Sequence, residues 1–91
     1  MTDEWDGVSF VISSTYRVDT LRRLQTGPAP PSVIASDTGH SIAHVSRALQ
    51  ELQDEELVQL LVSEERRKGR VYGTTERGES VVEMIETQNL G

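Results

Sequence analysis

Residues 34–49 of the chain read IASDTGHSIAHVSRAL, and they carry the clearest structural signal in the sequence. Ala35 is small enough to let two helices touch, and Gly39, four residues later, takes a positive φ without steric cost. Apolar residues then recur at helical spacing in the following segment, at Val45, Ala48 and Leu49. The stretch therefore predicts two helices joined by a tight turn, with the second helix facing a core.

The residues around this stretch predict where its two helices begin and end. Pro31 suits the first turn of a helix over residues 32–37, which stops at Gly39. Ser41 is a natural N-cap for a longer helix that reaches about Asp54.

Helical spacing of apolar residues also runs upstream, over residues 5–25. Ser13 or Ser14 can interrupt this helix and cap a second stretch. The pairs Gly-Pro at 27–28 and Pro-Pro at 30–31 end it and mark a short loop.

Downstream of the longer helix the pattern changes from helix to strand. Residues 57–62 are short and rich in branched apolar side chains, residues 64–69 form a charged turn, and residues 70–74 form a returning strand. A last helix begins near Thr75, with Thr74 or Thr75 as its cap. The order helix, helix, helix, strand, turn, strand, helix predicts one α+β domain over residues 1–91, mainly α with a two-stranded β-hairpin.

The helix that starts at Ser41 is predicted to present short polar side chains and an arginine away from the core. This outward set is Ser41, Ala43, His44, Ser46 and Arg47. Such a helix can enter the major groove of double-stranded DNA and read base edges, while its amino end favours phosphate. An ordinary helical hairpin is the alternative that this segment alone leaves open.

The turn between the two strands carries a cluster of basic residues. The cluster consists of Arg66, Arg67, Lys68 and Arg70. A hairpin tip of this kind can straddle the DNA backbone and place an arginine in the minor groove. The alternative is a solvated loop whose basic residues pair with Glu64 and Glu65.

The overall charge opposes nucleic-acid binding. Fifteen acidic residues against nine basic ones give a formal net charge of −6, and a protein of this sign is repelled by DNA. Lys68 is the single lysine, and an acidic chain almost free of lysine is what a halophilic archaeal protein is expected to have. High salt screens such a surface within a few ångströms.

The remaining composition argues against an enzyme or a metal protein. Cysteine is absent, no nucleophile–base–acid set is visible, and no glycine-rich phosphate loop occurs. His40 and His44 are four residues apart, but only Asp37 lies close enough to add a ligand, so metal binding is disfavoured. We therefore expect no cofactor. With no signal peptide and no apolar run of about 20 residues, we expect a cytoplasmic protein without a membrane partner.

Two apolar segments at the ends of the chain have two interpretations. Core packing is the favoured one for Trp5, Phe10 and Tyr16, and a dimerisation surface is the alternative. The last helix, with its apolar face around Val81 and Ile85, has the same ambiguity. Because the core of so short a chain is modest, we expect a homodimer.

The motifs together resemble the winged-helix transcriptional regulators of archaea and bacteria, in the broad MarR- and ArsR-like group, and most of all small haloarchaeal and phage-repressor-type winged helices. Residues 41–52, SIAHVSRALQEL, are similar to the family's recognition helix, and residues 72–78, YGTTERG, to the segment that follows its wing. The likeness covers about residues 16–86. It implies a winged helix-turn-helix fold and a dimer that reads two DNA half-sites. It further implies that the helix starting at Ser41 contacts bases or phosphates and that the basic tip contacts the flanking backbone.

Three positions depart from the family pattern. His40 stands where an aliphatic residue is usual, so a less tightly packed turn is expected. Glu56 replaces a customary glycine before Leu57, and Thr74 replaces a leucine. These departures concern local geometry rather than the fold.

Two functions from different classes follow from the sequence. The first is a transcriptional regulator, acting as a repressor that occupies a promoter; the sequence does not specify a small-molecule effector. The second is a winged-helix protein-interaction module of a larger complex, which the acidic charge favours. An acid-free surface around Arg47 and the basic tip would favour DNA, whereas a surface broken by Glu51, Glu64 and Glu65 would favour the module.

Overall fold

A computed structural model describes residues 4–62 and 70–88 of the chain. Its elements, in chain order, are α1 (Glu4–Ile12), α2 (Thr15–Leu24), α3 (Pro31–Thr38), α4 (Ile42–Asp54), β1 (Val58–Val62), β2 (Val71–Thr74) and α5 (Glu76–Gln88). The predicted α+β order is confirmed. The predicted helix over residues 5–25 is two helices, with the break at the position that the two serines indicated.

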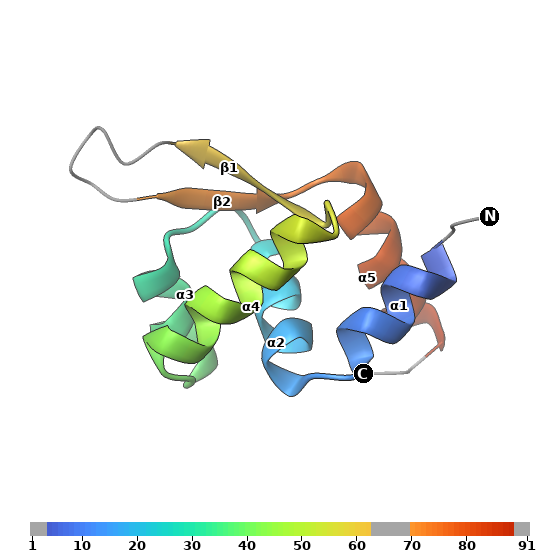
Figure 1. Ribbon diagram of the computed structural model, residues 1–91, viewed down its shortest axis with the longest axis horizontal. Coiled ribbons are helices and arrows are strands. Elements are labelled where there is room, and N and C mark those ends of the chain that lie inside the picture. The colour runs from blue at the N-terminus through green and yellow to red at the C-terminus, as the bar shows by residue number, and fades with distance from the viewer. Residues whose placement is uncertain (1–3, 63–69, 89–91) are drawn as a thin grey trace.

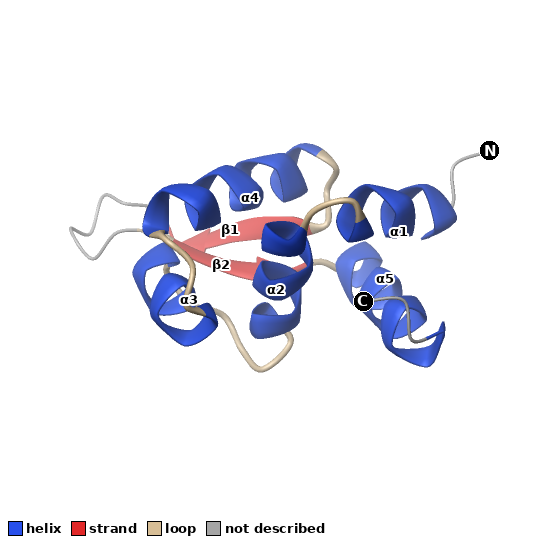
Figure 2. Cartoon of the chain, turned by 90° about the horizontal axis from the view of Figure 1, so that it is seen from below, coloured by secondary structure: helices blue, strands red, loops and turns tan. Residues whose placement is uncertain are grey.

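The helices form two groups, with the hairpin along one side (Figure 1). α2, α3 and α4 pack on one another, and the β1–β2 hairpin covers this bundle, which Figure 2 shows from below. α1 and α5 lie side by side at the opposite end of the molecule from α3. α2 belongs to the bundle that holds the predicted DNA-reading helix and also contacts α1 and α5, so it joins the two groups.

β1 and β2 pair antiparallel, and a third segment of backbone extends this small sheet. Val58 pairs with Thr74 and Leu60 with Tyr72, and the register shifts by one residue before Val62 pairs with Val71. Ala29, in the loop before α3, forms a bridge with Tyr72 through backbone hydrogen bonds of 3.1 and 3.0 Å. These two bonds fix the hairpin to the loop between α2 and α3.

One continuous core lies between the helices and the hairpin. Its buried members come from every element, and the largest fully buried ones are Leu21, Ile34, Leu49, Leu52, Leu57 and Ile85. Phe10 packs against this core as predicted. Trp5, by contrast, has 51% of its surface exposed, so the prediction that it packs in the core is wrong. Trp5 is the second residue of α1, and the buried side chains of this helix, Val8 and Val11, lie further along it.

Side-chain caps and one glycine define the helix ends. The Ser14 and Ser41 hydroxyls accept hydrogen bonds from the backbone N–H groups of Arg17 and His44, at 3.4 and 3.2 Å. Thr75, rather than Thr74, caps α5, because its hydroxyl accepts from the Gly78 N–H at 3.0 Å. α3 ends at Gly39, which has the left-handed conformation that the tight turn requires (φ 80°).

Among the described residues, no helix is both long and apolar enough to cross a membrane.

Candidate nucleic-acid interface

α4 is divided lengthwise into a buried face and an exposed face. Val45, Ala48, Leu49 and Leu52 are buried in the core. The five residues predicted to face outward are all exposed: Ser41, Ala43, His44, Ser46 and Arg47. The helical period therefore separates the two sets as expected, and the exposed face begins at the amino end of α4.

His44 is held against α2 by an aromatic contact that the sequence did not predict. Its ring stacks on that of Tyr16, with a centroid distance of 4.2 Å and an interplanar angle of 14°. Its Nδ1 atom also lies 3.0 Å from the Ser41 hydroxyl. Tyr16 is 37% exposed, so the prediction of a core position for this residue is wrong. No periodicity in the sequence places α2 beside α4, and only the packing of the two helices brings these rings together.

His40 completes this cluster from the turn between α3 and α4. Its ring meets Tyr16 edge-on at a centroid distance of 4.8 Å, and its Nε2 atom lies 2.7 Å from Asp19 Oδ2. The departure from an aliphatic residue at this position is therefore accommodated by polar and aromatic contacts with α2. In the part of the chain that the structure describes, no group of three histidine, cysteine or acidic residues is arranged to hold a metal ion.

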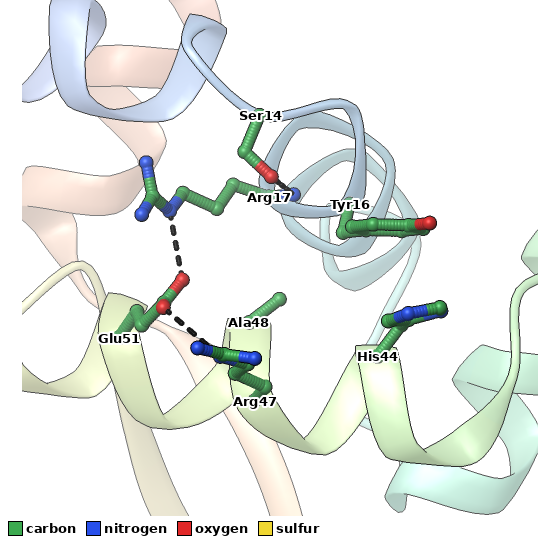
Figure 3. A pocket seen from close by; sticks show the side chains of 7 residues that line it. All are labelled: Ser14, Tyr16, Arg17, His44, Arg47, Ala48 and Glu51. Carbon is green, nitrogen blue, oxygen red and sulfur yellow. Dashed lines mark hydrogen bonds and ion pairs between the residues drawn. The ribbon is translucent and has the colours of Figure 1, made fainter.

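Arg47 and Glu51 lie one turn apart on α4, and Arg17 of α2 reaches the same carboxylate (Figure 3). Glu51 Oε1 accepts a hydrogen bond from Arg17 Nε at 3.0 Å, and Glu51 Oε2 lies 3.7 Å from Arg47 Nε. The Arg47 side chain is 80% exposed. Together with Ser14, Tyr16, His44 and Ala48, these residues line a pocket of about 280 Å³ between α2 and α4. The surface beside Arg47 is therefore not free of acid, but its acid is paired.

Arg70, the residue before β2, lies on the side of α4 opposite the pocket that Arg17 and Glu51 line. Arg70 is exposed and lines, with Ser46 and Gln50, a depression of about 430 Å³ between α4 and β2. Two predicted site residues far apart in the sequence, Ser46 and Arg70, thus border the same depression. Arg66, Arg67 and Lys68 lie outside the described residues, as do Glu64 and Glu65.

The described part of the chain thus combines the helix pair α3–α4, whose second helix has an exposed polar face, with the β1–β2 hairpin. Residues 5–89 match the family described as the HVO_A0261 N-terminal domain. The chain belongs to this family. No match to this chain was found among curated proteins.

Solved structures of two transcription regulators and of ZitR share the fold of this chain. The reduced form of YodB from B. subtilis has a TM-score of 0.79 at 19% identity, covering 98% of this chain and 88% of that one. The MarR family regulator SP03579 has a TM-score of 0.76 at 23% identity, over 85% and 52% of the two chains. A mutant of ZitR from Lactococcus lactis, solved in complex with DNA, has a TM-score of 0.71 at 22% identity, over 84% and 52%.

These likenesses confirm the winged-helix fold predicted from the sequence. The chain spans about half the length of SP03579 and of ZitR, and most of the length of YodB. At these identities the likeness concerns the fold, and the function must be argued from the exposed face of α4.

Proposed function

We propose that this protein is a sequence-specific regulator of transcription that binds double-stranded DNA as a homodimer and represses by occupying a promoter. α4 lies in the major groove with Ser41, Ala43, His44, Ser46 and Arg47 near bases and phosphates. Arg66, Arg67, Lys68 and Arg70 contact the flanking backbone. The observation that carries the proposal is the exposed face of α4, which is rigidly backed by the core and begins at the amino end of the helix.

The solved neighbours support this proposal. SP03579 and YodB are described as transcription regulators, and the ZitR structure contains DNA. The part that they share with this chain covers 84–98% of it. A winged helix that presents a polar face with an exposed arginine is suited to binding DNA.

A protein-interaction module is the second candidate, and the formal net charge of −6 favours it. Such a module needs no basic face. Pairing of Glu51 with Arg17 weighs against it, because the acid nearest to Arg47 is then largely neutralised within the protein.

Fluorescence anisotropy tests the proposal with a labelled duplex from upstream of the gene and a random duplex, each over a wide KCl series. A specific regulator binds the upstream duplex more tightly, and its affinity falls less steeply with salt than that for the random duplex. Arg47→Ala should weaken specific binding by about tenfold, the size expected for loss of one arginine contact to a base or phosphate, without changing the melting temperature.

Arg77→Ala is a suitable control, since Arg77 lies on α5 and donates to the Glu55 carbonyl rather than to the exposed face of α4. A folded protein that binds neither duplex at any salt concentration would favour the interaction module.

A further inference from the structure

Arg17 of α2 is held in place by several contacts at once. Its Nη1 atom donates to the Phe10 carbonyl at 2.7 Å and to the Ser13 hydroxyl at 2.9 Å, and its guanidinium lies 4.0 Å from the centre of the Phe10 ring. Its Nε atom donates to Glu51 Oε1 at 3.0 Å. The Arg17 side chain is only 18% exposed. Arg17 therefore has little freedom to leave Glu51.

Arg47 is bound to the same carboxylate much more weakly. Its distance to Glu51, 3.7 Å, is too long for a hydrogen bond, and its side chain is 80% exposed. An exposed ion pair between residues one helical turn apart is readily exchanged for a better partner. Glu51 is thus shared unequally, with Arg17 as its fixed partner and Arg47 as its loose one (Figure 3).

The unequal sharing of Glu51 matters because this carboxylate lies beside the surface that is proposed to contact DNA. It lies one turn after Arg47 on the helix that is proposed to enter the major groove. An unpaired carboxylate at this position would repel DNA phosphates and would also hold Arg47 back. With Arg17 in place, the group of two guanidinium ions and one carboxylate carries a net positive charge.

We propose that Arg17 is a positioning residue for DNA binding: it neutralises Glu51 from within the protein and so frees Arg47 to contact DNA. Arg17 itself does not touch the nucleic acid. This inference rests on the proposed function, and it explains how an acidic chain keeps a DNA-reading face. It also gives a function to the contacts that Arg17 of α2 makes with the end of α1 and with α4. These contacts lie outside the helix-turn-helix motif of the sequence.

A double-mutant cycle tests the proposal, with DNA affinity measured by anisotropy on the duplex that the wild-type protein binds. Arg17→Met should weaken binding about five- to tenfold, the effect of one uncompensated charge several ångströms from a phosphate. Glu51→Gln alone removes the carboxylate that holds Arg47 back, so it should bind at least as tightly as wild type, and in this background Arg17→Met should change affinity by no more than about twofold. An equally large loss on Arg17→Met in both backgrounds would overturn the proposal and indicate direct contact by Arg17.

The neighbouring pair of Arg22 with Glu86 provides a matched control, since it joins α2 to α5 rather than to α4. Arg22→Met and Glu86→Gln should leave DNA affinity unchanged.

Arg17→Lys separates charge from folding, because it keeps the positive charge and loses the guanidinium geometry. It should bind within about twofold of wild type, and a loss as large as that of Arg17→Met would overturn the proposal. Failure of the wild-type protein to bind any duplex would instead refute the proposed function, and the role of Arg17 with it.

Discussion

At the scale of the residue, Glu56 is the most unusual position in the described backbone. It is the non-glycine residue with a positive φ, at 63°, and it joins the end of α4 to β1. In the winged-helix pattern, glycine is customary at this position. The structure keeps the left-handed turn that glycine would adopt and imposes it on a glutamate. Two hydrogen bonds hold this turn: the Glu56 N–H donates to the Gln53 carbonyl at 2.9 Å, and the Thr75 hydroxyl donates to the Glu56 carbonyl at 2.7 Å.

Glu56→Gly should therefore stabilise the protein. Relief of the left-handed conformation gains about 1–2 kcal/mol, and the extra freedom of glycine in the unfolded chain offsets part of that, leaving about 1 kcal/mol. Chemical denaturation followed by circular dichroism measures the difference. Glu55→Gly is the matched control: Glu55 has a φ of −93°, so glycine there should bring no gain. Equal effects of the two substitutions would contradict the interpretation.

At the scale of the element, α4 is oriented by contacts with α2 as well as by its buried face. Tyr16 stacks on His44, and Arg17 pairs with Glu51 two turns further along α4. Both contacts come from adjacent residues at the start of α2, just after the cap at Ser14. The position of α2 therefore decides how the exposed face of α4 is presented.

Tyr16→Ala should destabilise the fold by about 1 kcal/mol through loss of the aromatic contact, and Tyr16→Phe should not, because the phenyl ring still stacks. His44→Ala completes the double-mutant cycle in thermal or chemical unfolding. The effects of Tyr16→Ala and His44→Ala should be less than additive, since either one removes the shared stack. Strict additivity would show that the two rings do not stabilise each other.

At the scale of the whole molecule, the exposed apolar residues of α1 lie at the end remote from α3. Trp5 is 51% exposed and Ile12 is 39% exposed, and α5 packs beside α1 at this end. Burial of this end against a second copy would leave both α4 helices free for two DNA half-sites. This arrangement is the basis of the proposed homodimer.

Sedimentation equilibrium should show a dimer at micromolar concentration, and Trp5→Ser should shift the protein toward monomer by at least about tenfold in dissociation constant, as expected for an interfacial tryptophan. Val33→Ser is the control, because Val33 is also an exposed apolar residue, at 39%, but lies on α3. A monomeric wild-type protein, or dimers unaffected by Trp5→Ser, would refute an interface at α1.

Local patterns in the sequence predict the helices and strands and the two faces of α4. Periodicity, the glycine at position 39 and the cap at Ser41 are local properties, and each acts within a few residues of its place in the chain. The same locality explains the successful distinction between buried Val45 and exposed Arg47.

The residues that surround the exposed face of α4 are set by the packing of α2 against α4. Tyr16 and Arg17 meet His44 and Glu51 across about 30 residues of sequence, and no local pattern encodes the angle at which α2 crosses α4. The pairing of Glu51 with Arg17 was likewise invisible in a count of charges, because a net charge of −6 does not say which acid faces which base. Contacts between elements depend on how whole faces pack, and packing is settled only when the core closes.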